Sequence, residues 1–124
     1  MRTPLKRVRY LGSAHGGTHD FWIVRVTGAA AFILSVLATI VMIAAVGRPY
    51  KDTVVLLGSP LIAATFALLI AVSAMHMRVG MQEIIEDYVH GERVKILATV
   101  ANTFFAAAVG VVGVIAVVKL AVGV

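Results

Sequence analysis

The sequence predicts an all-α integral membrane protein with three transmembrane helices and a cytoplasmic N-terminal segment. Composition is the first reason: of 124 residues, 60% are hydrophobic and 14% are charged, and the mean hydropathy is +0.98, which is typical of membrane proteins. The second reason is three uncharged runs, over residues 26–47, 53–75 and 96–118. Each run reaches the ~20 residues that a helix needs to cross ~30 Å of hydrocarbon. We therefore expect residues 1–124 to form a single membrane domain.

The N-terminal part is expected to be a tail followed by the first span. Residues 1–20 combine basic residues with glycines, which favours a flexible cytoplasmic tail. The first span is expected over about residues 21–47, and its apolar run is longer than the ~7 to 15 residues of a signal-peptide core, so the mature chain should keep it. The Gly and Pro of residues 47–52 predict a short connection, which makes the first two spans antiparallel neighbours.

The second span is expected over about residues 53–78 and the third over about 94–120. Pro60 lies a few residues into the second span and is expected to bend it, at low cost near the first turns. Gly91 marks a break before the third span. In that span Ala106 and Gly110 have small-xxx-small spacing and Asn102 is strongly polar, which favours close packing against another helix.

The positions of lysine and arginine predict the orientation. Eight of the eleven precede or open the first span or lie between the second and third spans. These eight are Arg2, Lys6, Arg7, Arg9, Arg25, Arg78, Arg93 and Lys95. The positive-inside rule then places the N-terminus and the segment over residues 76–95 on the side of the cytoplasm (or matrix), and the C-terminus outside. The net charge of +5 reflects this topology, so we expect no nucleic-acid partner.

His76 is the strongest candidate for cofactor chemistry. It directly follows the second uncharged run, so we expect it inside the membrane, where a polar side chain needs a partner. A hydrogen bond to a neighbouring helix and axial ligation of a haem iron are both open interpretations. The chain has no cysteine, which excludes thiolate ligation and iron–sulfur clusters held by this chain alone. Because His15, His19 and His90 lie outside the spans, a second histidine ligand would have to come from another subunit.

Arg25 opens the first span at the same cytoplasmic face. It can set the topology by extending to the interface, or it can bind an anionic group at the membrane boundary, such as a haem propionate. His15 and His19 are four residues apart, but without acidic or cysteine partners at matching positions they are a weak indication of a metal site.

Asp87 and Tyr88 lie eleven and twelve residues after His76. If the helix continues, eleven residues turn ~1,100°, so Asp87 shares the face of His76 and lies ~16 Å further toward the cytoplasm. A tyrosine hydroxyl beside a carboxylate can donate to a quinone carbonyl and relay a proton. An interfacial tyrosine beside a solvated acid is the alternative, and the chemistry of the residues alone favours it.

Two stretches of the sequence together carry a family resemblance. HMRVGMQEIIEDYVH, residues 76–90, has a histidine, then a Gly-Met pair and then an Asp-Tyr pair. THDFWIVRVTGAA, residues 18–30, has His-Asp-Phe from its second residue onward and an arginine at Arg25. Both resemble the hydrophobic membrane anchor family of succinate dehydrogenase, the succinate:quinone oxidoreductase of respiratory complex II, in its bacterial type related to mitochondria. The resemblance spans three helices in matching order and nearly the whole chain.

The resemblance implies specific roles for five residues. His76 would be one axial ligand to the iron of haem b, and the second ligand would come from the second membrane anchor of the complex. Arg25, and less surely His19, would contact the haem propionates. Tyr88 would hydrogen-bond the ubiquinone head group, and Asp87 would assist proton delivery.

The resemblance also implies a complex and a location. The chain would be a membrane-anchor domain that performs no chemistry alone, with the second membrane anchor, the iron–sulfur subunit and the flavoprotein subunit as partners, besides membrane lipids. Flavin and iron–sulfur clusters would lie only in those partners, and electrons would pass from succinate to ubiquinone. The location would be the bacterial inner membrane, with the C-terminus in the periplasm.

Three other functions are compatible with the same residues. A fumarate reductase anchor would run the reaction in reverse. A small proton or ion channel subunit would line its path with His76, Asp87 and Arg78. A structural anchor or small assembly factor would hold no cofactor. A visible absorption spectrum distinguishes a haem-containing anchor from the channel subunit and the structural anchor, because a haem absorbs visible light and the other two proteins hold none.

Overall fold

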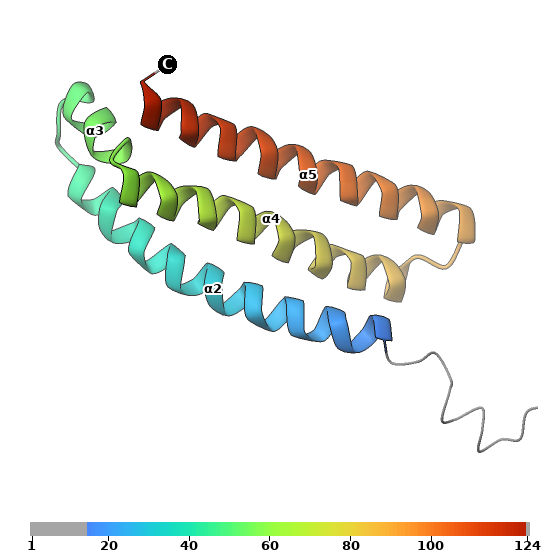
Figure 1. Ribbon diagram of the computed structural model, residues 1–124. Coiled ribbons are helices and arrows are strands. Elements are labelled where there is room, and N and C mark those ends of the chain that lie inside the picture. The colour runs from blue at the N-terminus through green and yellow to red at the C-terminus, as the bar shows by residue number, and fades with distance from the viewer. Residues whose placement is uncertain (1–14, 124) are drawn as a thin grey trace, which may run out of the picture.

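The computed structural model describes residues 15–123, with side chains from residue 18 onward. It contains α2 (His15–Ala45), α3 (Tyr50–Leu57), α4 (Pro60–Tyr88) and α5 (Glu92–Val122), and no strand within those residues (Figure 1). Three segments are long and apolar enough to cross a membrane: Thr18–Ala45, Pro60–Tyr88 and Glu92–Val122. The predicted all-α class with three candidate spans is therefore confirmed.

The three long helices lie antiparallel, with α4 between α2 and α5 (Figure 1). The first two spans are thus antiparallel neighbours, as predicted. One end of the molecule holds the start of α2 and the α4–α5 connection, and the other holds α3 and the C-terminus (Figure 1). Residues 15–20, assigned to the tail from the sequence, belong to α2, and the rest of the predicted tail lies outside the described residues.

The connection after α2 follows the glycine and proline of the sequence. Gly47 has a φ of 79°, a left-handed conformation that glycine adopts without steric cost and that commonly ends a helix. Pro49, with φ of −58° and ψ of 154°, precedes the first turn of α3. Because proline fixes φ near −65°, the chain enters α3 in a defined direction.

The second uncharged run is not one helix, which corrects the expected span over residues 53–78. Residues 50–57 form α3, Gly58 and Ser59 interrupt the helix, and α4 begins at Pro60. Proline at the first helical position loses no intrahelical hydrogen bond, so Pro60 begins α4 instead of bending a span. At the interruption, a Cβ on Gly58 would lie 3.1 Å from the Leu120 carbonyl oxygen. The chain therefore turns there against the end of α5.

The α4 helix continues well beyond His76 and ends at Tyr88. Val79 and Ile85 are both buried, so an apolar face packs against neighbouring helices along this stretch. The connection to α5 consists only of residues 89–91. The sequence assigned Arg78, Arg93 and Lys95 to the loop between the second and third spans, which is wrong: Arg78 lies in α4, and Arg93 and Lys95 lie in the first turns of α5.

The α4–α5 interface is a close approach of small residues. Ala106 is 3% exposed, and a Cβ on Gly110 would lie 3.2 Å from the Cβ of Ala74. The predicted role of Ala106 and Gly110 in helix packing is confirmed. Gly113 contributes as well, because its Cβ would lie 2.6 Å from Cγ2 of Ile70.

Asn102 provides a directed contact in the same interface. It is 9% exposed, and its Nδ2 donates a hydrogen bond of 2.8 Å to the carbonyl oxygen of Arg78. A side-chain amide that bonds a backbone carbonyl of the neighbouring helix satisfies its polarity and fixes the register of the two helices. The predicted packing role of Asn102 is confirmed, with a partner that the sequence did not indicate.

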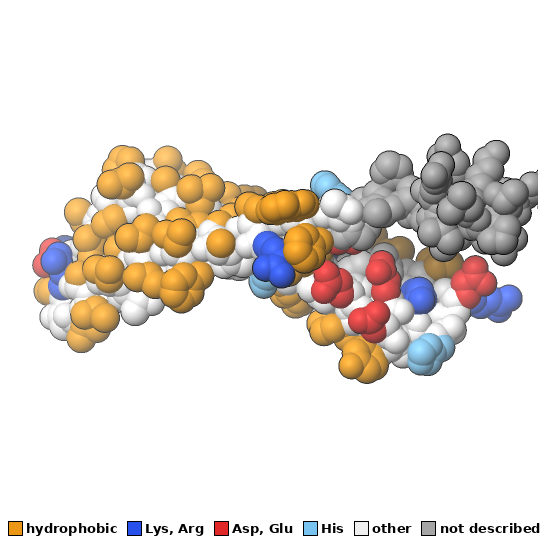
Figure 2. Space-filling model, turned by 90° about the horizontal axis from the view of Figure 1, so that it is seen from below, with side chains coloured by type: hydrophobic (Ala, Val, Ile, Leu, Met, Phe, Trp, Pro, Cys, Tyr) orange, Lys and Arg blue, Asp and Glu red, His pale blue; other side chains and the backbone are white. Residues whose placement is uncertain are grey.

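Most of the molecular surface is hydrophobic. Figure 2 shows apolar side chains along the length of the helices, charged and histidine side chains gathered at the end where α2 begins, and a smaller charged group at the other end. Large side chains along the spans are exposed, such as Phe32 at 71% and Phe104 at 72%. Such a surface fits the hydrocarbon of a bilayer or the apolar faces of other membrane proteins.

Candidate functional site

His76 lies at the α2–α4 interface, half-buried, with its ring against two consecutive residues of α2. Its Nδ1 is 3.0 Å from Oγ1 of Thr27, and Thr27 is only 7% exposed. A Cβ on Gly28 would lie 3.2 Å from Cε1 of His76 and 3.7 Å from Nδ1. The Nδ1–Cε1 edge of the imidazole therefore faces α2.

The hydrogen bonds of Thr27 restrict the roles of the ring nitrogens of His76. The Thr27 hydroxyl contacts the carbonyl oxygen of Ile23, one turn earlier in α2. A carbonyl oxygen only accepts hydrogen bonds, so the single hydroxyl proton of Thr27 can serve either Ile23 or His76. In the arrangement that satisfies both contacts, the hydroxyl donates to Ile23 and Oγ1 accepts a proton from Nδ1 of His76. In a neutral imidazole, Nε2 is left with a free lone pair.

Nε2 of His76 is available to a group outside this chain. It makes no hydrogen bond to the described residues, and the described part of the chain has no fully buried side-chain nitrogen or oxygen that lacks a partner. Nε2 therefore reaches the surface of the chain. Gly80 lies one turn further along α4, and a Cβ there would meet nothing within 4 Å, so the space beside this face is open.

The donor set favours a haem over a bare metal ion. Among the described residues no group of three or more His, Cys, Asp or Glu side chains could hold a metal ion. His76 offers one nitrogen, and haem iron needs only axial ligands from protein because the macrocycle supplies the others. The residues present thus fit a haem shared with another chain.

Arg25 lies on α2 shortly before Thr27 and Gly28. Its guanidinium carbon is 4.4 Å from the centroid of the Phe21 ring, a distance suitable for a cation–π interaction, and the side chain is exposed. His19 is also exposed, but six residues along a helix turn ~600°, so it lies ~120° around α2 from Arg25. The structure does not bring these two predicted contacts together.

Asp87 and Tyr88 form the end of α4. Both are exposed, Tyr88 by 76%, and the N–H of the next residue, Val89, bonds the Ile85 carbonyl at 3.0 Å. Since α4 is continuous from His76 to Tyr88, Asp87 shares the face of His76, ~16 Å away along the axis. The two predicted groups are therefore separate sites on one helix.

A second polar cluster links α4 to α5 near the same end. Nε2 of Gln82 donates to Oγ1 of Thr99 at 3.1 Å and to Oε1 of Glu86 at 3.3 Å. Nζ of Lys95 donates to the carbonyl oxygen of Glu86 at 3.4 Å. This cluster stabilises the α4–α5 hairpin, and it contains none of the predicted cofactor residues.

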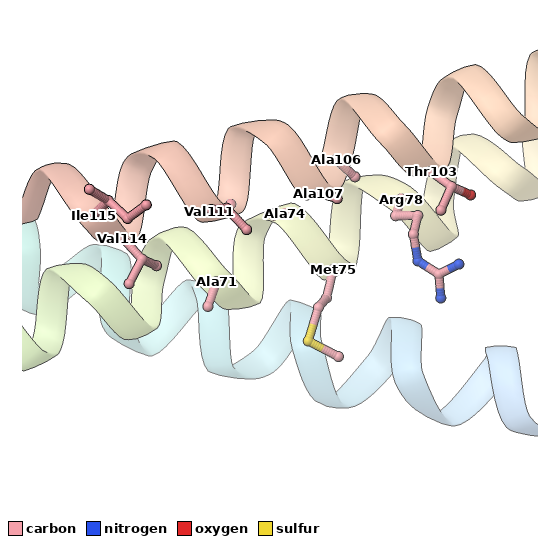
Figure 3. A pocket seen from close by; sticks show the side chains of 11 residues that line it. Ala71, Ala74, Met75, Arg78, Thr103, Ala106, Ala107, Val111, Val114 and Ile115 are labelled. Carbon is pink, nitrogen blue, oxygen red and sulfur yellow. The ribbon is translucent and has the colours of Figure 1, made fainter.

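An apolar groove of ≈ 530 Å³ lies between α4 and α5 (Figure 3). Figure 3 shows Met75 and Arg78 projecting from α4 along it, with Thr103 on α5. His76 does not line this groove, so it is distinct from the candidate haem site. Its lining residues are Ala71, Ala74, Met75, Arg78, Thr103, Ala106, Ala107, Gly110, Val111, Val114 and Ile115.

Sequence reasoning missed Thr27 and Gly28 as neighbours of His76. Both lie in the stretch THDFWIVRVTGAA, but a hydroxyl or glycine within an apolar helix most simply indicates helix packing. Only the pairing of α2 with α4 identifies His76 as their partner. The available signal was a glycine directly after a threonine in an apolar helix. This pair does not specify which neighbouring helix it contacts.

Comparison with known proteins finds one matching family and one similar characterised protein. Residues 1–110 match the family described as succinate dehydrogenase/fumarate reductase transmembrane subunit. The succinate dehydrogenase hydrophobic membrane anchor subunit of Paracoccus denitrificans is 32% identical over 121 residues, covering 98% of this chain and 93% of the relative. No solved structure matches the chain.

Proposed function

This chain belongs to the succinate dehydrogenase/fumarate reductase transmembrane subunit family, and on that premise we propose that it binds haem b and contributes to a ubiquinone-reduction site. Family membership makes it a membrane anchor that works with partner chains. We take those partners to be a second membrane anchor, an iron–sulfur subunit and a flavoprotein subunit. In this proposal the chain supports electron transfer from succinate to quinone and performs no reaction alone.

The availability of Nε2 on His76 is the observation that carries the proposal. His76 is held through Nδ1 by Thr27. Its Nε2 has no hydrogen-bond partner among the described residues, and a Cβ on Gly80, one turn further along α4, would meet no described atom within 4 Å. An axial ligand needs this combination of a fixed ring and an accessible lone pair. A haem bound there would accept and release single electrons, and its second axial ligand would come from the second membrane anchor.

Arg25 would bind an anionic substituent of that haem. Its position in the N-terminal part of α2, three residues before Gly28, supports a role toward a propionate group, which guanidinium can bind in a fork. Its stacking on Phe21 restrains the side chain at the membrane boundary. His19 is the weaker candidate, because it lies on another side of α2.

Tyr88 and Asp87 would face the quinone. Tyr88 is exposed at the end of an apolar helix, where its hydroxyl can donate a hydrogen bond to a quinone carbonyl oxygen. The adjacent carboxylate of Asp87 can accept and pass on protons from the aqueous side, as reduction of a quinone to a quinol requires. Their distance from His76 supports a quinone position separate from the haem, with Asp87 on the His76 face of α4 and Tyr88 ~120° around the helix from it.

The proposed orientation has the α4–α5 connection in the cytoplasm and the C-terminus in the periplasm of a bacterial inner membrane. The bases near that connection, with Arg25 at the start of the first span, support it through the positive-inside rule. A reporter enzyme that works only in the periplasm, fused after Val124, should then be active. A cytoplasmic reporter signal would reverse the topology and move Tyr88 to the other side.

The experiment that tests the cofactor is a reduced-minus-oxidised visible spectrum of the complex that co-purifies with this chain. Wild type should show a b-type haem band, and His76→Ala should lose or convert it. His90→Ala is the matched control, because His90 lies in the exposed α4–α5 connection, and it should retain the band. An unchanged band in His76→Ala would remove His76 as a ligand. If the complex contains no haem, the remaining interpretations are a structural anchor and a channel subunit, neither of which holds a cofactor.

A further inference from the structure

We infer that Thr27 and Gly28 are positioning residues for His76: the Thr27 hydroxyl fixes the protonation and orientation of the imidazole, and Gly28 sets how closely the ring approaches α2. This inference rests on the proposed haem ligation and assigns a function to two residues of a different helix. The geometry of His76 as an iron ligand then depends on the α2–α4 interface and not on α4 alone.

Thr27 fixes the histidine because one arrangement satisfies both of its contacts. In that arrangement the hydroxyl proton is directed to the Ile23 carbonyl oxygen, and Oγ1 accepts the Nδ1 proton of His76, with Oγ1 and Nδ1 3.0 Å apart. Thr27 is buried at 7% exposure, so water does not compete for the contact. A histidine that donates from Nδ1 to a fixed acceptor presents Nε2 in one orientation and is a more basic ligand.

Gly28 allows the imidazole to lie close to α2. An added Cβ would lie 3.2 Å from Cε1 of His76, closer than ordinary van der Waals contact. An alanine would therefore require the imidazole to move away from α2 by a few tenths of an ångström, which changes its contact with Thr27. The Thr27–Gly28 pair therefore holds the imidazole from one edge while the opposite nitrogen remains free.

The test compares haem properties in complexes that carry Thr27→Val, Thr27→Ser and Thr39→Val. Thr39 is the matched control, because it makes the same bond to a carbonyl one turn earlier in α2, to Ser35 at 2.7 Å, but is exposed and does not contact His76. We expect Thr27→Val to shift the haem midpoint potential to more positive values, because a less basic axial ligand stabilises ferric iron less. Its low-temperature EPR signal should also change. Thr27→Ser and Thr39→Val should match wild type in both.

Gly28→Ala is the second, independent variant and keeps the inference testable if Thr27→Val fails to assemble. We expect it to change the EPR signal and to increase the fraction of reduced haem that binds carbon monoxide, because a tilted imidazole dissociates more readily. A purely structural contact would alter complex yield but leave the potential and EPR signal of the assembled fraction unchanged.

The outcomes separate this inference from the proposed function. If His76→Ala removes the haem but Thr27→Val and Gly28→Ala both keep the wild-type potential and EPR signal, the positioning role is wrong and haem ligation stands. If Thr27→Ser fails to restore the wild-type potential, the hydroxyl is not the active group, which also overturns the role assigned to Thr27. If wild type contains no haem that depends on His76, the proposed function fails and the inference fails with it.

Discussion

The two sides of α4 are built differently. Toward α5, the contact is a close approach of small residues, with Ala74 against Gly110 and Ile70 against Gly113. Toward α2, a histidine ring and a threonine hydroxyl fill the interface instead. On the α5 side the buried Asn102 is satisfied by a backbone carbonyl, whereas on the α2 side the second nitrogen of His76 has no hydrogen-bond partner among the described residues.

This difference suggests that the α5 side of α4 serves the stability of the chain and that the α2 side serves its function. Small residues let helix backbones approach closely, and packing of this kind is a main source of helix association in membranes. A titratable side chain in a membrane interface adds cost unless it has a partner or a function. Substitutions on the α5 side should therefore change the stability of the chain, and substitutions on the His76 face should change cofactor and quinone reactions.

The largest effect is expected at the C-terminal end of α4. Tyr88→Phe should lower succinate:quinone reductase activity by on the order of 10²-fold, because it removes a hydroxyl that donates to the quinone during proton transfer. Succinate oxidation with a soluble dye should be unchanged. Tyr50→Phe is the control, since Tyr50 is 83% exposed at the other end of the molecule. Equal quinone reductase activities in wild type and Tyr88→Phe would remove Tyr88 from the site.

The next effect is expected in the α4–α5 contact. Gly113→Ala places a Cβ where Cγ2 of Ile70 would be 2.6 Å away, and β-branched side chains adjust poorly in helices. We expect a loss of about 1–3 kcal/mol in the free energy of unfolding. Unfolding of the purified chain by SDS in mixed micelles, followed by circular dichroism, measures it. Wild-type stability would mean that α4 and α5 can separate slightly without cost.

A smaller effect is expected from Asn102→Leu. It removes the hydrogen bond to the Arg78 carbonyl, and hydrogen bonds between membrane helices contribute about 0.6 kcal/mol on average and up to ~1.7. The same unfolding experiment should show a loss in this range. Thr103→Val, at the adjacent exposed position, should show none. A loss at Thr103 equal to that at Asn102 would mean that the bond is not specific.

The smallest effect is expected from Gly80→Ala, which has no neighbour within 4 Å of its added Cβ. The free energy of unfolding of the isolated chain should stay within about 0.5 kcal/mol of wild type. Together with Gly113→Ala, this variant tests the same Gly-to-Ala change at an open and at a tightly packed position of the α4–α5 hairpin. A clear destabilisation would show that the His76 face is packed within this chain and is not open to a cofactor.

The sequence predicted the features that depend on composition and spacing. The three candidate spans follow from uncharged runs, and the packing role of Ala106 and Gly110 follows from their four-residue spacing. Asp87 was placed on the His76 face by helix periodicity, which required only that α4 continue to Tyr88. The roles of His76, Arg25, His19, Asp87 and Tyr88 toward haem and quinone stay predictions, because they depend on groups held by other chains of the complex.

Errors arose where a local signal competed with tertiary contact. Hydropathy alone joined α3 to α4 in one span, but Gly58 lies against the end of α5 and the chain turns there. Charged residues after His76 indicated a loop, but Val79 and Ile85 are buried against neighbours and keep the segment helical. In both cases the missing information was which helix lies alongside.

The sequence by itself determined that this protein crosses a membrane, how many long apolar helices it has and which residues can carry chemistry, because the cost of placing charge in hydrocarbon acts on each residue separately. Only the tertiary structure decided that Thr27 and Gly28 face His76 and that Nδ1, not Nε2, is the ring nitrogen beside Thr27. A hydrogen bond between residues 27 and 76 depends on the rotation and register of two helices, and helix periodicity gives the faces of each helix without pairing them.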